Sequence, residues 1–323
     1  MSGGTSGATS RGTSGATSRG TGRLLRRVTS QVKFPLAKPT WPAGVPRPAP
    51  VRRVGLDYDH EWSRRYPVRL ARAVVLDNVT RPAARLVAPT TVRGGEHLRH
   101  VPAPVIFAAN HVSHLDTPLL LTALPVRFRH RTVVAAAADY FFDRRWKAFL
   151  WSFSLAAIPI ERSRVNRRSA DVAAELLADG WNLVIFPEGG RSPHGWAQPF
   201  RPASAAYLAR RTGRPVVPVH LSGTRHVLPK AGERRLPRRS PVSVVFGMPL
   251  LPDDGEDARR FSARIERAVA VLADEASSDW WRARTRAARG GTPSLRGPEA
   301  ADWRRAWALD PRPDAGRDAW PRV

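Results

Sequence analysis

The central part of the chain alternates between two hydrophobic patterns. Apolar runs of five or six residues, such as 132–137, have the length of strands buried on both faces. Between these runs, apolar residues recur every three or four positions, which is typical of one face of a helix. Strands that alternate with helices predict an α/β fold, with a mostly parallel central sheet flanked by helices.

The expected elements follow from these two patterns. The strands are expected at 104–109, 132–137, 182–186, 216–221 and 242–246. The helices are expected at 64–87, 116–123, 140–154, 166–179 and 202–212, followed by a last helix that buries Phe261, Ile265, Ala268 and Leu272. The first of these helices places Val68, Ala71, Val75 and Val79 on one side and is basic on the other.

The two ends of the chain lack such patterns. Residues 1–56 contain ten Arg and Lys side chains, no acidic residue, and an eight-residue Gly/Ser/Thr repeat, so we expect a disordered basic arm. Residues 286–323 combine Arg, Pro and Trp and are expected to form a flexible tail. The interval 57–285 is therefore the expected catalytic or binding domain.

Charge and composition narrow the function classes. The 53 Lys and Arg residues exceed the 27 Asp and Glu residues by 26, which favours anionic partners such as nucleic acid, membrane surface or phosphorylated small molecules. The absence of cysteine excludes disulfides, thiolate nucleophiles and cysteine-based metal sites. No apolar run reaches the roughly 18 residues of a membrane span, and the start does not resemble a secretion signal.

The loop after the first expected strand carries the first candidate site. It reads Asn-His-Val-Ser-His-Leu-Asp, with His111 and Asp116 five residues apart. On a continuous helix the two side chains would point about 140° apart, so they can pair only if His111 lies in the turn before the helix. Paired in that way, the carboxylate orients the imidazole as a general base. The alternatives are two unrelated polar residues at a helix start, or a metal site with His111, His114 and Asp116.

A second candidate site follows the strand at 182–186. The sequence Phe-Pro-Glu-Gly-Gly-Arg-Ser places two glycines, which allow close backbone approach to a ligand, beside Arg191, whose guanidinium fits phosphate oxygens. Alternatively, it is an ordinary turn with a solvated arginine. Both loops follow expected strands, and binding sites in parallel sheets form at the carboxyl ends of strands.

Together the two motifs resemble the glycerolipid (lysophospholipid) acyltransferase family, the PlsC-like enzymes that acylate 1-acylglycerol-3-phosphate. Asn-His-x-Ser-x-x-Asp precedes Phe-Pro-Glu-Gly-x-Arg-Ser by some 70 residues. Ile158-Pro-Ile-Glu-Arg162 and Val216-Val-Pro-Val-His-Leu-Ser-Gly223 are similar to two further family blocks in the right order. The resemblance covers about residues 90–250.

The resemblance implies a role for each matching residue. His111 would deprotonate the acceptor hydroxyl for attack on an acyl thioester, acyl-CoA or acyl carrier protein, and Asp116 would orient it. Glu188, Gly189, Arg191 and Arg162 would bind the acceptor phosphate, and Pro218 would shape the acyl-donor pocket. The family uses no metal, no other cofactor and no covalent enzyme intermediate. The departures from the pattern are Gly190, where threonine is usual, and a missing glycine near Phe200.

We therefore expect an O-acyltransferase of phospholipid biosynthesis that acylates lysophosphatidate or a related lysophospholipid. The arginine-rich ends and exposed tryptophans predict a cytoplasmic protein that binds the anionic inner face of the cell membrane peripherally, with no nucleic-acid partner. The apolar and aromatic segment 140–153 lines an acyl-chain trench or belongs to the core. The alternatives are a non-catalytic binder of anionic membrane or polymer, a metal-dependent hydrolase, and an arginine excess that reflects coding bias.

Overall fold

The computed structural model describes residues 55–161, 167–192, 195–228 and 239–297. The expected basic arm lies outside these ranges except for its last two residues, and the expected tail beyond Gly297 lies outside them as well. Everything below concerns the described part of the chain.

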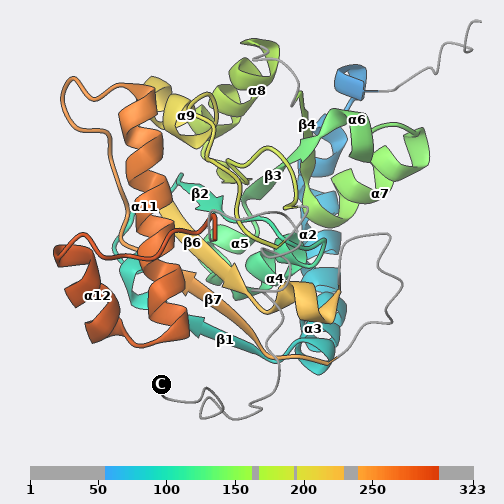
Figure 1. Cartoon of the computed structure of the whole chain (residues 1–323). Coiled ribbons are helices and arrows are strands. Elements are labelled where there is room, and N and C mark those ends of the chain that lie inside the picture. The colour runs from blue at the N-terminus through green and yellow to red at the C-terminus, as the bar shows by residue number, and fades with distance from the viewer. Residues whose placement is uncertain (1–54, 162–166, 193–194, 229–238, 298–323) are drawn as a thin grey trace, which may run out of the picture. The chain divides into compact units, whose positions relative to one another are not determined.

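A seven-stranded sheet forms the centre of the fold (Figure 1). Its strands are β1 (Thr90–Arg93), β2 (Ile106–Ala109), β3 (Thr132–Ala137), β4 (Ala157–Ile160), β5 (Asn182–Ile185), β6 (Val216–Ser222) and β7 (Val242–Phe246). They are ordered β1-β7-β6-β2-β5-β3-β4, and every neighbouring pair is parallel except β6 and β7. The mostly parallel α/β fold expected from the sequence is confirmed.

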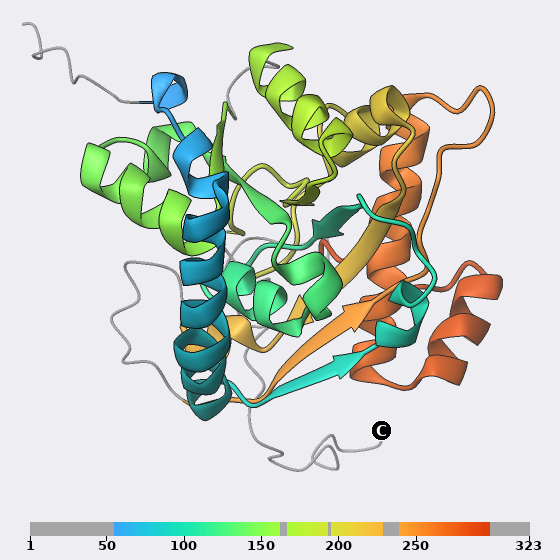
Figure 2. The ribbon, with the colours of Figure 1, turned by 180° about the vertical axis from the view of Figure 1, so that it is seen from behind.

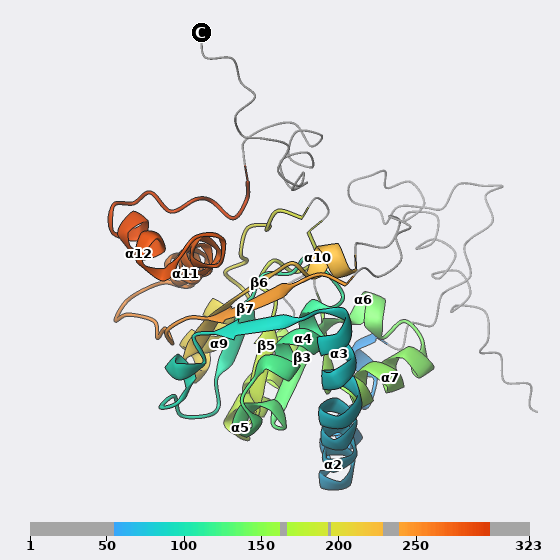
Figure 3. The same cartoon turned by 90° about the horizontal axis from the view of Figure 1, so that it is seen from below.

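Helices cover both faces of this sheet. They are α2 (Tyr66–Val75), α3 (Arg81–Val87), α4 (Asp116–Ala123), α5 (Val126–Arg129), α6 (Ala138–Phe141), α7 (Arg145–Leu155), α8 (Arg167–Ala178), α9 (Ala205–Thr212), α10 (Thr224–Val227), α11 (Ala258–Ser277) and α12 (Trp280–Ala288). A π-helical turn, η3 (Leu76–Thr80), joins α2 to α3. Short 3-10 turns lie at η1 (Gly55–Asp57), η2 (Glu61–Arg64) and η4 (Gly95–Leu98). Figure 3 shows α11 and α12 on one side of the sheet and α3 and α4 on the other.

The strand residues alternate between two cores. On β2, Ile106 and Ala108 pack into the cluster beneath α8, α9 and α11, whereas Phe107 and Ala109 pack into the cluster beneath α4 and α5. All four of these strand residues are fully buried. This explains why the strands are continuous apolar runs, because both faces of each central strand must be covered.

Three features differ from the sequence expectations. The single helix expected at 140–154 is divided into α6 and α7, because Phe142 turns inward and is fully buried. The strands β1 and β4 were not anticipated, and α12 follows the helix expected to be the last. Helix α12 passes the expected boundary at 285, and Leu295 packs beside the core under α9 and α11.

The segment expected as a helix over 64–87 is helical, with the π turn in its middle (Figure 2). Its orientation is the reverse of that in most soluble proteins. Arg72 is buried against the body together with the apolar Leu76, whereas six other large apolar side chains point outward. The exposed set is Tyr66, Leu70, Val74, Val75, Val79 and Leu86, with exposed fractions of 38–73%.

Candidate active site

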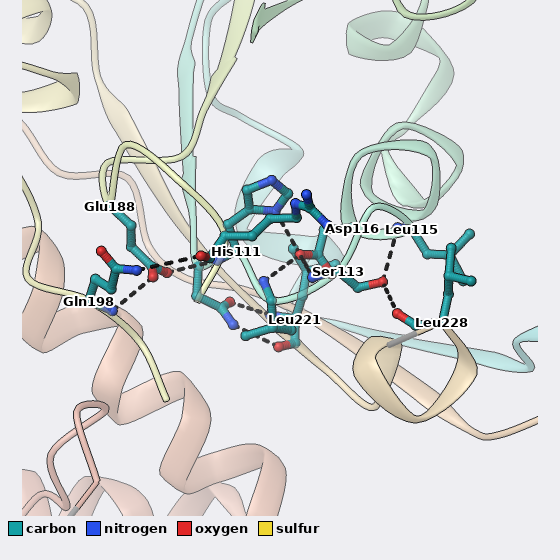
Figure 4. Close-up of polar contacts among 11 residues, drawn as sticks. His111, Ser113, Leu115, Asp116, Glu188, Gln198, Leu221 and Leu228 are labelled. Carbon is teal, nitrogen blue, oxygen red and sulfur yellow. Dashed lines mark hydrogen bonds and ion pairs between the residues drawn. The ribbon is translucent and has the colours of Figure 1, made fainter. Parts of the chain in front are cut away.

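The turn that carries His111 lies between β2 and α4. Residues 111–115 are not helical, and α4 begins at Asp116. His111 Nδ1 lies 2.8 Å from Asp116 Oδ2, so the predicted His–Asp pair is formed (Figure 4). Just before the turn, the Asn110 side-chain amide donates to the Leu221 carbonyl oxygen at 2.9 Å and accepts from its N–H at 2.7 Å. The turn is thereby fixed to the neighbouring strand β6.

Asp116 holds the turn in place as well as the imidazole. Its Oδ2 atom also accepts from the backbone N–H groups of Val112 and Ser113, at 2.7 and 2.8 Å. The side chain is completely buried. Because an ionised carboxylate only accepts hydrogen bonds, the hydrogen of the imidazole is placed on Nδ1. Nε2 of His111 then keeps a lone pair and can accept a proton.

The second motif encloses His111 from the other side. The Phe186 ring stacks on the His111 ring, with 4.0 Å between the ring centroids and 20° between the planes. The Ser192 N–H donates to the His111 carbonyl oxygen at 2.9 Å. Phe186 was not singled out in the sequence. Its position at the end of β5, beside the strand that leads to His111, is the signal that identifies it.

Glu188 lies behind the base and not in the cavity. Its Oε1 accepts from the His111 N–H and its Oε2 accepts from the Gln198 N–H, both at 2.8 Å (Figure 4). The residue is 1% exposed. Burial raises the pKa of its carboxyl to about 8, although the two N–H donors act in the opposite direction. The expectation that Glu188 binds a phosphate is therefore corrected, because its oxygens face backbone donors inside the protein.

A cavity of about 470 Å³ opens beside His111. One part of it is polar and contains Gly189, Arg191 and Arg201. The other part is apolar and runs between the sheet and α8 and α9; it is lined by Ala135, Ala157, Ile160, Ala173, Ile185 and Leu208, among others. Such a volume suits a ligand of lipid or drug size, and its two parts suit a molecule with a charged end and an apolar end.

Arg191 is the clearest candidate for binding an anion. Its Nη1 atom is buried and has no hydrogen-bond partner, and its guanidinium carbon lies 5.7 Å from the centre of the Tyr140 ring. The Tyr140 hydroxyl lies 3.3 Å from His114 Nε2. Burial, followed by the charge of Arg191, lowers the pKa of His114 to about 4, so His114 is neutral at pH 7.

The glycine beside Arg191 allows a second arginine to approach. Gly189 has φ = +75°, and a Cβ atom there would lie 2.7 Å from Arg201 Cζ. Glycine suits the left-handed backbone here, and any other side chain would also have to displace the flexible end of Arg201. Arg201 was not among the predicted site residues. The signal for it in the sequence is the glycine beside Arg191, which leaves room for a neighbouring side chain.

Other predicted site residues are placed elsewhere. Pro218 pairs with Ala108 within the sheet, and a Cβ atom on Gly247 would lie 2.8 Å from Pro218 Cγ. It is buried and does not line the cavity, so its expected part in an acyl pocket is corrected. Arg162 lies outside the described residues.

The aromatic segment that could form a trench or part of the core does both. Tyr140, Phe141 and Trp151 line the cavity, and Phe142 belongs to the core. Trp146 and Phe149 are more than half exposed. The break between α6 and α7 separates these neighbours in space, which periodicity alone does not reveal.

The described residues show neither a metal cluster nor a helix that could span a membrane. No three His, Asp or Glu side chains in the described ranges gather closely enough to share a metal ion. Within the same ranges, no helix has the length and apolarity needed to cross a bilayer.

Comparisons with known proteins agree with the site. The Acyltransferase family model matches residues 89–222. A chloroplastic 1-acyl-sn-glycerol-3-phosphate acyltransferase of Brassica napus is 29% identical over 170 residues, which are 50% of this chain and 45% of that protein. The enzyme of that name from Chlamydomonas reinhardtii is 31% identical over 180 residues, 54% of this chain and 50% of that protein.

The chain thus spans about half the length of these curated relatives. Among solved structures, the 1-acyl-sn-glycerophosphate acyltransferase PlsC from Thermotoga maritima matches 68% of this chain and 84% of its own, with 23% identity and a TM-score of 0.49. The matched family domain contains the His111 turn, the Glu188 loop and the strand β6 that fixes them. Residues 89–222 thus match the Acyltransferase family model, and about half of the chain is similar to 1-acyl-sn-glycerol-3-phosphate acyltransferases.

Proposed function

We propose that this protein transfers a fatty acyl group from an acyl thioester, acyl-CoA or acyl carrier protein, to the hydroxyl of lysophosphatidate or a related lysophospholipid. The observation that carries this proposal is the His111–Asp116 pair at the polar end of a cavity whose other end is apolar. The relatives are named for this reaction on 1-acyl-sn-glycerol-3-phosphate.

The proposed reaction needs one base and no covalent intermediate. The acceptor hydroxyl oxygen attacks the thioester carbonyl carbon while its proton passes to His111 Nε2. The carbon–sulfur bond then breaks, and the imidazolium returns the proton to the departing thiolate. The buried Asp116 carboxylate stabilises the imidazolium in between, and a base positioned in this way contributes about 10²- to 10⁴-fold in rate. No metal or other cofactor is required for these steps.

The cationic groups of the cavity account for the acceptor's phosphate. Arg191 offers a buried unpartnered N–H group, and Arg201 lies in the same cavity beside Gly189. Guanidinium groups bind phosphate oxygens through paired, charge-assisted hydrogen bonds. In this assignment Arg201, and not Glu188, binds the acceptor's phosphate together with Arg191. Gly189 contributes by leaving room for the Arg201 side chain.

The activity can be tested by release of thiol. The chain has no cysteine, so a thiol reagent gives no background. We expect palmitoyl-CoA to release thiol with lysophosphatidate, less with glycerol 3-phosphate, and none in His111→Ala. The exposed His226 provides a matched control, and His226→Ala should retain wild-type rates. Equal rates in His111→Ala and wild type would refute the assigned base.

We also propose that the protein acts as a peripheral protein on the inner face of the cell membrane. The support is the outward apolar side of α2, η3 and α3, which spans Tyr66 to Leu86. Between Val74 and Val79, a step of five residues would turn a regular helix by about 140°. The π turn takes up the extra residue, so the two valines share one side. An apolar side of this kind suits the lipid interface.

Flotation with vesicles tests the membrane proposal. We expect Leu70→Ser with Val74→Ser to weaken binding to anionic vesicles at least tenfold. Met248 and Leu251 are exposed apolar residues away from these helices, and the same double change there is the control. Equal binding by both double variants would show that the outward side of the helix does not contact lipid.

A further inference from the structure

A group of arginines lies at the end of the sheet opposite to His111. Arg131 precedes β3 and Trp181 precedes β5, so both lie where these parallel strands begin. Arg69 reaches the same place from α2. The guanidinium carbons of Arg69 and Arg131 lie 5.1 and 5.8 Å from the centre of the Trp181 ring. The candidate active site lies at the other ends of the strands and shares none of these residues.

These arginines retain unused hydrogen-bond donors. Arg72 is 7% exposed, and its Nη1 donates to the carbonyl oxygens of Ser63, Ser152 and Phe153. Its Nη2 is buried without a partner, and so is Nε of Arg69. A buried donor that finds no acceptor costs about 1–3 kcal/mol, so an acceptor supplied by a ligand is favoured here.

The charges of the nearby Glu61, Asp59 and Asp179 act on the neighbouring Arg64, whose pKa burial nevertheless lowers. Asp77 pairs with Arg129 and His130. Arg131 contacts Asp179 through the carbonyl oxygen, at 3.0 Å. In the described part of the chain, no carboxylate forms an ion pair with Arg69, Arg72 or Arg131. These three arginines therefore have no carboxylate in direct contact, although Asp59, Glu61 and Asp179 lie nearby.

The lowered pKa values of Arg69 and Arg72 also favour binding of an anion by this group. Burial first, and then the charge of Arg131, lowers the pKa of Arg69. Burial first, and then the charges of Arg69 and Arg64, lowers the pKa of Arg72 to about 10. The guanidinium groups thus repel one another in a partly desolvated place, and a bound anion would relieve this repulsion.

We propose that Arg69, Arg72 and Arg131 form a second, phosphate-binding site beside Trp181, separate from the candidate active site. Guanidinium groups match phosphate oxygens in geometry and charge. The phosphate belongs to a lipid headgroup or is free in solution. A membrane that contacts the exposed Tyr66 and Leu70 would bring lipid headgroups close to Arg69, because these residues flank Arg69 on the same helix.

The test uses the full chain carrying Arg191→Gln and Arg201→Gln, so that phosphate bound in the cavity does not contribute. In this background, Arg69→Gln with Arg131→Gln removes the site. Arg259→Gln with Arg267→Gln removes the same charge from exposed positions of α11 and is the matched control. Melting temperature is measured against inorganic phosphate at constant ionic strength, since a ligand that binds only the folded state raises it.

We expect a saturable rise in melting temperature in the parent and in the control. In the site variant the apparent dissociation constant should increase at least tenfold. Flotation then separates the two sources. Vesicles containing phosphatidate are compared with vesicles that carry the same surface charge from oleate.

If a lipid headgroup is the ligand, the site variant binds phosphatidate vesicles at least tenfold more weakly than the control, and oleate vesicles equally well. If free phosphate is the ligand, only the thermal response is lost. The proposal is overturned if the control loses as much as the site variant. It is also overturned if the parent shows neither a saturable phosphate response nor a preference for phosphatidate.

Discussion

Glu188 provides a sharp test of how the site is built. If its carboxylate positions His111, replacing it should reduce the turnover number and the stability of the fold. If it bound the acceptor's phosphate, replacing it should change the KM for the acceptor. The structure favours the first role, because both oxygens accept backbone N–H groups and the side chain is 1% exposed.

The expected magnitudes follow from the two hydrogen bonds. Glu188→Ala leaves two N–H groups without acceptors, each at a cost of about 1–3 kcal/mol, so about 2–6 kcal/mol of unfolding free energy is lost. Glu188→Gln keeps one amide oxygen and should lose about half as much. A base misplaced by about 1 Å costs on the order of 100-fold in rate, and we expect kcat of Glu188→Gln to fall by tenfold to 100-fold.

Steady-state kinetics with varied lysophosphatidate, together with denaturant unfolding, measure both quantities. Arg191→Gln is the comparison for a phosphate ligand and should raise the acceptor KM at least tenfold. Glu175→Gln, an exposed change on α8, is the control for loss of a carboxylate. An acceptor KM that rises in Glu188→Gln as it does in Arg191→Gln, with unfolding free energy unchanged, would refute the positioning role.

Three further outcomes are expected. Asp116→Asn should fold, because the amide oxygen can still accept hydrogen bonds from the N–H groups of Val112 and Ser113. Its kcat in the thiol assay should fall about 10²- to 10⁴-fold, because the His111 imidazolium loses its counter-charge. A rate within threefold of wild type would contradict the proposed role of the His111–Asp116 pair. Gly189→Ala should displace Arg201 and raise the acceptor KM about tenfold. It should also lower the melting temperature, because alanine is strained in the left-handed backbone conformation. Unchanged kinetics would show that Arg201 does not bind the acceptor's phosphate. Because burial raises the pKa of Glu188 from 4.5 to about 8, the folded state holds a proton that the unfolded state loses, so its contribution to stability is present below pH 4.5 and is lost as the pH rises through 8. Relative to Glu188→Gln, the unfolding free energy of wild type should therefore decrease over this range by up to about 1.4 kcal/mol per pH unit, and a parallel pH profile for the two proteins would show that Glu188 does not titrate there.

The sequence predicted the His111–Asp116 contact because the relevant geometry is local. His111 and Asp116 are five residues apart, and the only way to pair them is a turn followed by a helix start. The central strands were also predicted from the sequence, because each is covered on both faces and is therefore a continuous apolar run. The helix ends at Gly180 and Gly213 were predicted as well, because glycine readily adopts the positive φ that ends a helix, and both residues have it here.

The roles of Glu188, Pro218 and Arg201 depended on contacts that sequence spacing does not encode. Glu188 lies 77 residues from His111, and the direction of its carboxylate depends on β2 and β5 being neighbours in the sheet. Pro218 faces the same side of the sheet as the cavity, but it lies on β6, where it packs beside Gly247 and Leu272, and it is not among the residues that line the cavity. Arg201 meets Gly189 only because the chain folds back after β5.

The helix pair α2–α3 shows the same division. The sequence pattern predicts that one side of these helices is apolar and the other basic, and a soluble protein would be expected to bury the apolar side. Only the packing of Arg72 against the carbonyl oxygens of Ser152 and Phe153 determines that the apolar side faces outward. Periodicity and spacing thus predicted most of the central elements and the His111–Asp116 pair, because these depend on near neighbours in the chain. Tertiary packing decided which face is buried, which arginines meet in the cavity and which carboxylate supports the base, because those depend on partners far away in sequence.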